Sequence, residues 1–286
     1  ITSSNIASVT PMAASPVVWV NAAIHGDEVV GVEVIRRVLR DLDPRTVRGT
    51  LIAVPIVNVL GFTAGDRYLP DRRDLNRSFP GSPRGSLAGR IAHLFMREVV
   101  APCEVGIDLH TGADRRSNLP QVRADLDDPR TRRLASAFGA PVMLHAQIRD
   151  GSLRQAARER GATVLLYEGG EAMRFDEWAI EPAVAGVHRV LTELGMTEPW
   201  EGDSPAADPA ELRSSAWVRA RRTGILQMEC ELGQEVVRGD RLGGLTDSFG
   251  RALAVVKADR DGVVIGRTEM PLVNAGDALV HIGSRG

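Results

Sequence analysis

The chain has 286 residues, more than one compact domain usually contains, so we expect a large domain with a smaller appendage. Apolar residues make up 43% and charged residues 25%, proportions that are typical of a globular protein and exclude a disordered or fibrous chain. The formal net charge of -2 gives no field that would attract nucleic acid or an anionic membrane, so the expected partner is a small molecule.

Cysteine content and hydropathy indicate the compartment. Cys103 and Cys230 are too few and too far apart for a disulfide framework or a thiolate metal site. No apolar run reaches membrane-spanning length, and the segment Ile1 to Pro16 lacks the pattern of a secretory signal. We therefore expect a cytoplasmic protein.

From Val17 to about Met196, short apolar runs alternate with longer amphipathic stretches, which predicts an α/β domain with a central sheet flanked by helices. The predicted strands are Val17 to Ala22, Thr50 to Val57, Val105 to Leu109, Pro141 to Leu144 and Thr163 to Tyr167. The predicted helices are Glu28 to Leu42, Leu87 to Val100, Pro129 to Phe138, Leu153 to Arg160 and Glu177 to Leu194. Because the strands are continuously apolar, both faces of the sheet should be covered.

One connection, Asn58 to Ser86, is long and rich in Gly, Pro, Asp and Arg, and loops of this length tend to be functional. Within it, Asn76 and Arg77 place an amide beside a guanidinium, and such a pair can bind a carboxylate. The alternative for this segment is a surface loop pinned by salt bridges.

The C-terminal part has a different pattern. The segment Pro199 to Glu211 is acidic and rich in Pro and Ala, which marks a linker. We predict a large domain over residues 1–198, a linker over 199–213 and an all-β domain over 214–286. The β domain carries a weak repeat, in which Gly224-Ile225-Leu226 leads to Gly239-Asp240-Arg241-Leu242 as Gly262-Val263-Val264 leads to Gly276-Asp277-Ala278-Leu279.

This repeat resembles the lipoyl and biotinyl carrier modules, whose two halves interlock as a flattened barrel. A carrier needs a modifiable lysine at the turn that joins the halves, where Asp247 to Gly250 stands instead. The only lysine, Lys257, lies within a predicted strand. We therefore expect a structural or oligomerisation role for the β domain, with a carrier function through Lys257 as the alternative.

The first candidate metal ligands follow the strand Val17 to Ala22. A His and a Glu three residues apart, His25 and Glu28, can lie on one side of the first helical turn. Gly26 between them allows a close approach to whatever is bound. The structural alternative is a helix start whose acidic residues only favour the helix dipole, and the pair alone is a weak signal.

A second histidine, His110, ends another predicted strand, and strand ends are where open α/β sheets bind ligands. Asp108 faces the same side of that strand and could orient the imidazole. Two His and one carboxylate leave the fourth position of zinc open for water, which suits a catalytic site. A capping or turn role is the alternative for His110.

A hydrolytic zinc site needs a general base, and a carboxylate within reach of the water is the usual solution. Glu168 ends the apolar run Thr163 to Tyr167 and precedes two glycines, so we expect it at a strand terminus, where packing does not explain a carboxylate. Glu171 is the second candidate, and a solvated loop acid is the alternative for either residue.

These motifs, in this order, resemble the succinylglutamate desuccinylase and aspartoacylase family, a branch of the zinc carboxypeptidase superfamily, over about Val17 to Met196. The resemblance implies a mixed central sheet and one zinc ion held by His25, Glu28 and His110, with Glu168 as the general base. It also implies an arginine that polarises the scissile carbonyl, and residues that bind the substrate. The former matches Arg67, with Arg72 or Arg73 as alternatives, and the latter match Asn76, Arg77 and Arg154.

The segment Asn118 to Leu126 and the β domain look like the longer bacterial members, among them N-acetyl-diaminobutyrate deacetylases. The implied function is the zinc-dependent hydrolysis of the amide bond of a small N-acyl amino acid or a related N-acyl amine. A metallocarboxypeptidase acting on peptides and a non-catalytic binding protein on the same fold are the alternatives. Motif spacing does not encode the acyl group, the amine or the oligomeric state, so a homo-oligomer is left open.

Overall fold

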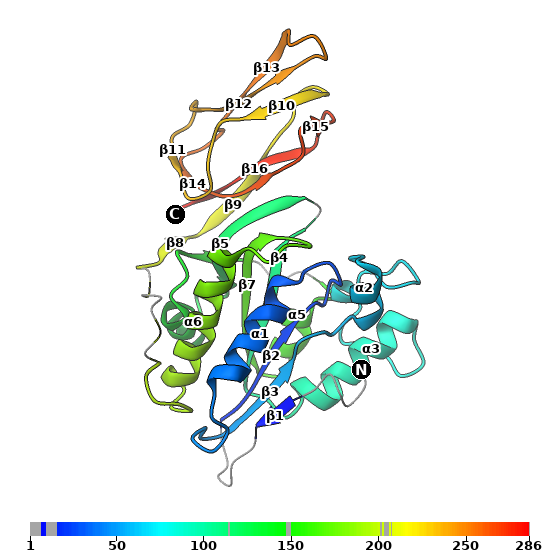
Figure 1. Cartoon of the computed structure of the whole chain (residues 1–286), viewed down its shortest axis with the longest axis vertical. Coiled ribbons are helices and arrows are strands. Elements are labelled where there is room, and N and C mark those ends of the chain that lie inside the picture. Colours follow the sequence, from blue (N-terminus) through cyan, green and yellow to red (C-terminus); the bar gives the residue numbers. More distant parts are fainter. Residues whose placement is uncertain are drawn as a thin grey trace.

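The computed structural model describes residues 7–9, 16–113, 115–146, 150–200, 202, 206 and 208–285. Within them, twelve strands form one mixed sheet and four strands form a second, antiparallel sheet. Figure 1 shows the helices packed around the N-terminal part of the large sheet, with the all-β region extending from one end. The predicted fold, an α/β domain followed by a C-terminal β region, is confirmed.

The centre of the large sheet has the strand order β1-β3-β2-β4-β7-β5. The bounds of these strands are β1 Ala7–Val9, β2 Val17–Ala22, β3 Thr50–Val54, β4 Val105–Gly112, β5 Arg116–Ala124 and β7 Thr163–Glu171, and β6 Val142–His145 pairs with β5. The run from β3 to β7 is parallel, whereas β5 is antiparallel to β7. The central sheet is therefore mixed, as the family resemblance implies.

Helices cover both faces of this sheet, and its central strands are therefore buried on both sides. One face carries α1 Val30–Asp41, α4 Pro129–Phe138 and α6 Glu177–Glu193. The other face carries α3 Leu87–Phe95, a π-helical turn Met96–Val100 and α5 Leu153–Arg158. Among the described helices, none combines the length and the apolar character needed to cross a membrane.

The bounds of several elements differ from those predicted from the sequence. The first helix begins at Val30 rather than Glu28, because Glu28 closes a turn in which its amide donates to the His25 carbonyl at 3.2 Å. The long connection contains α2 Val59–Ala64 and a 3-10 turn Leu75–Arg77. Strand β7 continues to Glu171, so Glu168 lies within the strand rather than at its terminus. Strand β5 was not predicted at all.

The C-terminal region consists of short strands whose pairing explains the repeat. Their bounds are β8 Ala210–Leu212, β9 Ser214–Arg219, β10 Gly224–Met228, β11 Glu235–Val236, β12 Arg241–Thr246, β13 Ala252–Lys257, β14 Gly262–Thr268, β15 Leu272–Val273 and β16 Ala278–Ser284. Strand β10 pairs with β12 and β14 pairs with β16, while β11 crosses to β14 and β15 crosses to β10. The two halves are thus interlocked, and Lys257 is the exposed last residue of β13.

The two regions share one sheet. Strand β14 pairs with β5, and β8, which falls in the predicted linker 199–213, pairs with β6. The predicted boundaries of the two domains stay a prediction, but the β region is joined directly to the strands that surround the candidate site.

Candidate active site

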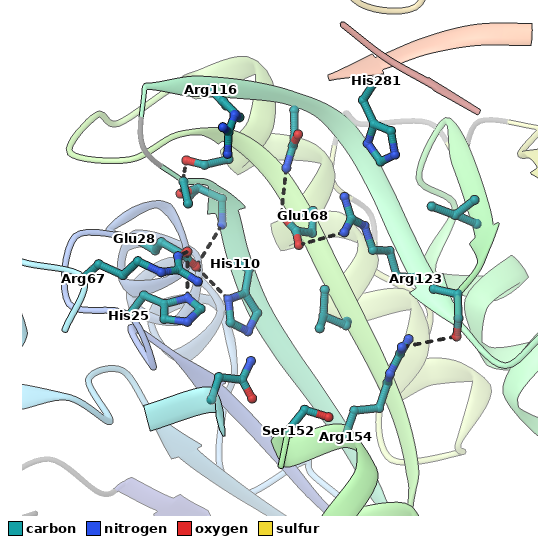
Figure 2. Close-up of a pocket in the computed structure, with 18 of the residues that line it drawn as sticks. His25, Glu28, Arg67, His110, Arg116, Arg123, Ser152, Arg154, Glu168 and His281 are labelled. Carbon is teal, nitrogen blue, oxygen red and sulfur yellow. Dashed lines mark hydrogen bonds and ion pairs between the residues drawn. The ribbon is translucent and has the colours of Figure 1, made fainter. Parts of the chain in front are cut away.

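His25, Glu28 and His110 converge at the carboxyl ends of β2 and β4 (Figure 2). The Nδ1 atom of His25 lies 2.8 Å from Oε1 of Glu28, and Nδ1 of His110 lies 2.6 Å from Oε2 of the same carboxylate. All three side chains are buried, and one ligand atom from each lies within 4.8 Å of the others. The structure therefore brings together the three side chains that the sequence predicts as metal ligands.

The other nitrogen of each imidazole faces a second carboxylate. Nε2 of His25 lies 3.1 Å from Oδ1 of Asp74, and Nε2 of His110 lies 3.0 Å from Oδ2 of Asp108, a charge contact that is too poorly aligned for a hydrogen bond. Asn21 donates to the other Asp108 oxygen at 2.7 Å. Because a carboxylate faces Nε2 of each imidazole, Nδ1 is the nitrogen that remains to bind a metal ion. Two imidazole nitrogens and one carboxylate are the donor set of a catalytic zinc site, so these residues fit zinc.

The charges of this group support the same conclusion. Burial raises the pKa of Glu28, but His25 and His110 outweigh it and hold the pKa well below its usual range. Burial lowers the pKa of His110, yet Asp108 and Glu28 raise it well above its usual value. Burial also lowers the pKa of His25, but Glu28 and Asp74 together outweigh it and raise the pKa. The space between the ligand atoms thus favours positive charge, which protons or a metal cation can supply.

Gly26 is needed for packing rather than for access to a ligand. A Cβ atom added at this position would lie 2.1 Å from the carbonyl carbon of Gly61 and 2.5 Å from the carbonyl oxygen of Asp66. The expectation that Gly26 lets a bound group approach is therefore wrong. The close approach is made by the backbone of α2 and the segment after it, and it holds the turn from His25 to Glu28 in place.

Glu168 lies beside His110, because the two residues are register partners on the neighbouring parallel strands β7 and β4. Its carboxylate accepts a hydrogen bond from Nδ2 of Asn118 at 2.7 Å and lies 3.4 Å from Nη1 of Arg123. The side chain is 15% exposed and lines the same cavity, of about 1290 Å³, as the metal ligands. Glu171, the second candidate base, instead pairs with Arg174 at 3.4 Å and does not line this cavity.

Arg67 is the arginine that lies at the metal group. Its Nη1 is 3.0 Å from Oε1 of Glu28 and its Nη2 is 3.5 Å from Oδ2 of Asp74. The side chain is 22% exposed and lines the cavity. Arg72 and Arg73 are exposed and do not line the cavity. Of the three arginines proposed for carbonyl polarisation, the structure therefore favours Arg67.

The predicted substrate-binding residues also line the cavity. Asn76 is buried, and its Oδ1 accepts a hydrogen bond from the Leu153 amide at 2.9 Å. Arg77 is exposed and donates to the Asn76 carbonyl, while Nη2 of Arg154 donates to the Ala146 carbonyl at 3.2 Å. The bond between Asn76 and Leu153 ties the long connection to the first turn of α5, and both segments contribute residues to the cavity.

The β region contributes side chains that the sequence analysis missed. Trp217 on β9 and His281 on β16 stack with ring centroids 4.6 Å apart, and the guanidinium of Arg116 lies 5.3 Å from the Trp217 ring. All three line the cavity. Their only sequence signal is a histidine and a tryptophan in short strands, because the register between β9 and β16 is what brings them together.

A second group of potential ligands, Asp125, Asp127 and His145, lies where β5 and β6 end. Its carboxylates are paired with arginines, since Asp125 lies 2.9 Å from Arg158 and Asp127 lies 2.6 Å from Arg213. The carboxylates of this group are therefore held in ion pairs.

Comparison with known proteins extends the resemblance. Residues 14–194 match the family model "Succinylglutamate desuccinylase/Aspartoacylase catalytic domain". The N-alpha-acetyl-L-2,4-diaminobutyric acid deacetylase of Halomonas elongata is 30% identical over 282 residues, which covers 93% of this chain and 82% of that enzyme. A succinylglutamate desuccinylase of Burkholderia pseudomallei is 30% identical over 201 residues, and the match covers 61% of this chain but only 56% of that enzyme. The product-bound structure of the ectoine utilization protein EutE from Ruegeria pomeroyi superimposes with a TM-score of 0.85 at 28% identity, covering 95% of this chain and 86% of that one.

Proposed function

The chain belongs to the succinylglutamate desuccinylase/aspartoacylase family, and we propose that it is a zinc-dependent deacylase that hydrolyses the amide bond of a small N-acyl amino acid. The observation that carries this proposal is the buried group of His25, Glu28 and His110, which shares one cavity with the carboxylate of Glu168. The functions that the names of the relatives state, deacetylation of an N-acetyl diamino acid and desuccinylation of an N-succinyl amino acid, support the same reaction.

Zinc held by His25, Glu28 and His110 would act as a Lewis acid that polarises the amide carbonyl and acidifies a water molecule. Glu168 takes the proton from that water as it attacks the carbonyl carbon, and then delivers the proton to the nitrogen of the departing amine. The C–N bond breaks, and the acyl group leaves as a carboxylate.

Arg67 places a fixed positive charge beside the metal group, where the oxyanion of the tetrahedral intermediate develops. A preorganised donor of this kind commonly contributes roughly 3 to 4 kcal/mol to the stabilisation of the transition state. The contacts of Arg67 with Glu28 and Asp74 fix the guanidinium before substrate arrives, so little reorganisation is needed during the reaction.

Asn76, Arg77 and Arg154 would bind the carboxylate of the substrate. Arginine binds carboxylates in bidentate fashion, and the three side chains come from two segments that line the cavity. An amino acid product has such a carboxylate, which favours an N-acyl amino acid over an uncharged N-acyl amine. A cytoplasmic location and a homo-oligomeric state remain predictions of the sequence.

A substrate panel separates this proposal from its alternatives. We expect hydrolysis of N-acetyl and N-succinyl amino acids, beginning with N-acetyl-2,4-diaminobutyrate, and little release of C-terminal residues from short peptides. The opposite preference would indicate a metallocarboxypeptidase. Absence of zinc and of chelator-sensitive hydrolysis would indicate a binding protein, and an intact mass that shows a modification on Lys257 would indicate a carrier.

Glu168→Gln is the sharpest test of the mechanism. The amide keeps the size of the side chain but cannot take a proton, so we expect kcat to fall by roughly 100- to 10,000-fold while the zinc content stays at one ion per chain. Glu171→Gln is the matched control, because it makes the same change three residues further along β7 and outside the cavity. Turnover by Glu168→Gln close to the wild-type rate would rule out Glu168 as the base.

A further inference from the structure

Strand β5 lies between Glu168 and the β region. It pairs with β7, which carries Glu168, on one side and with β14 of the β region on the other. A change in β14 that shifts β5 can therefore move the residues that lie next to Glu168.

The pairing between β5 and β7 contains an irregularity that changes where side chains point. Asn118 is the register partner of Gly170 and Gln121 is the register partner of Glu168, so three steps along β5 match two steps along β7. Residues three apart in a regular strand face opposite sides of the sheet, whereas a bulge with one extra residue places both on the same side. Pro120 lies within this bulge, where its missing N–H donor costs no ladder hydrogen bond.

The bulge turns Asn118 onto the face that Glu168 occupies. Its amide nitrogen Nδ2 donates to Oε2 of Glu168 at 2.7 Å, a shorter contact than the 3.4 Å between Glu168 and Arg123. Asn118 is only 5% exposed, so its hydrogen bond is largely shielded from water. Oδ1 of Asn118 cannot take the place of Nδ2, because an amide oxygen would face a carboxylate oxygen.

Strand β14 holds this arrangement from the opposite side. Gly266 is the register partner of Asn118, and a Cβ atom added at Gly266 would lie 2.7 Å from Oδ1 of Asn118. Gln121 spans the bulge, because its Nε2 donates to the carbonyls of Leu119 at 3.1 Å and of Ile265 on β14 at 3.0 Å. The amide of Asn118 thus lies between the Glu168 carboxylate and a strand that only a glycine allows to come so close.

We infer that Asn118 is a positioning residue that orients the Glu168 carboxylate, and that the β region takes part in catalysis through the contact of Gly266 with Asn118. This inference rests on the proposed role of Glu168 as the general base. A carboxylate with one oxygen held by Asn118 and the other near Arg123 has a fixed plane, which is what proton transfer to and from a water of defined position requires.

The test compares variants of Asn118 that separate its size from its donor. Asn118→Asp keeps the shape of the side chain and replaces the donor with a carboxylate, whereas Asn118→Ala removes both. In mildly alkaline buffer, we expect both variants to keep bound zinc and the KM of the N-acyl amino acid, while kcat falls by roughly 10- to 100-fold. Asp should be no better than Ala, because it repels Glu168. A wild-type kcat in either variant would show that the Asn118 donor is not needed to orient Glu168, and that result overturns the inference.

A second variant tests the contribution of the β region without a substitution in β5. Gly266→Ala forces the Asn118 amide to move, so we expect a several-fold loss of kcat at constant KM and zinc content. Gly244→Ala is the matched control, because this strand glycine lies in the other sheet of the β region and its added Cβ would meet only the end of the flexible Arg241 side chain, at 3.1 Å. Equal kcat values for the two alanine variants would overturn the role of Gly266.

Glu168→Gln distinguishes a failure of this inference from a failure of the proposed function. If Glu168→Gln is inactive while both Asn118 variants turn over at the wild-type rate, Glu168 is the base and Asn118 does not position it. If Glu168→Gln itself is as active as the wild type, the base has been assigned wrongly, and the positioning role is overturned with it.

Discussion

The metal group and the Glu168 region face one cavity, but they are held in different ways. The three proposed metal ligands lie at the carboxyl ends of β2 and β4, where Glu28 contacts both imidazoles directly. Glu168 has no such partner among the metal ligands, and its carboxylate is held by Asn118 and Arg123 of the antiparallel strand β5. The metal group is held by contacts among its own three side chains, whereas Glu168 is held by β5, which pairs with β14 of the β region.

This difference separates two kinds of perturbation. Changes in the metal group should act on zinc binding and remove all activity together with the metal. Changes around Glu168 should leave zinc in place and act on the rate of proton transfer or on the fit of the substrate. Zinc content and kinetic constants, measured on the same variants, therefore report on the two regions independently.

The largest expected effect is that of Glu28→Gln. Glu28 is the one anionic ligand and lies between both imidazoles, so a neutral amide removes the charge that balances the cation. We expect zinc to be lost on dialysis and activity to fall on the order of 1000-fold or more. Metal analysis and turnover after dialysis measure both effects, with Glu33→Gln on α1 as a control acid that pairs with Arg36 and Arg37. Full zinc occupancy in Glu28→Gln would show that the metal group has been identified wrongly.

The next largest expected effect is the change of zinc affinity with pH. In the metal-free protein, the carboxylates around His110 and His25 outweigh burial and raise the pKa of both imidazoles above the usual value. Zinc needs neutral imidazoles, so below these pKa values it must displace protons, and its affinity should rise with pH and level off above them. The slope should approach roughly tenfold per pH unit for each displaced proton.

Calorimetry in two buffers of different ionisation enthalpy measures the protons released when zinc binds. Repeating the titration with Glu168→Gln sharpens the comparison, because a residue outside the metal group should leave the number of released protons unchanged. The ordinary histidine pKa of about 6.5 lies between pH 6 and pH 8. A zinc affinity that is constant over this range would contradict the assignment of the two imidazoles as ligands.

The same contrast explains what could be predicted from the sequence. The proposed metal ligands follow apolar strands, and parallel strands bring their carboxyl ends to one edge of the sheet, so His25, Glu28 and His110 could be identified by position. The helix Pro129–Phe138 has its predicted bounds. In the structure, Asp128 caps its first turn, Pro129 fits the start and Gly139 adopts the left-handed conformation after its end, so neighbouring residues define both ends.

The surroundings of Glu168 could not be predicted in this way. Strand β5 contains a proline and a bulge, which disguise the alternation that marks a strand. Asn118 reaches Glu168 over 50 residues of sequence, and Trp217 reaches the cavity only through pairing of β9 with β16. Such contacts depend on the register between distant segments, which no local pattern specifies.

The smallest expected effect concerns the cavity wall that the β region supplies. Trp217 stacks on His281 and lies under the guanidinium of Arg116, so it helps to hold two groups that line the cavity. Removing the indole ring in Trp217→Ala loses about 1 kcal/mol of cation-π and stacking interaction, so we expect KM to rise by roughly fivefold while kcat and zinc content change little. Phe249→Ala is the matched control, because Phe249 is an exposed aromatic of the same β region with Arg251 over its ring at 5.8 Å, and it lies outside the cavity. If both variants have the wild-type KM, the wall does not contact the substrate; if Trp217→Ala loses kcat instead, the wall acts on Glu168 rather than on substrate binding.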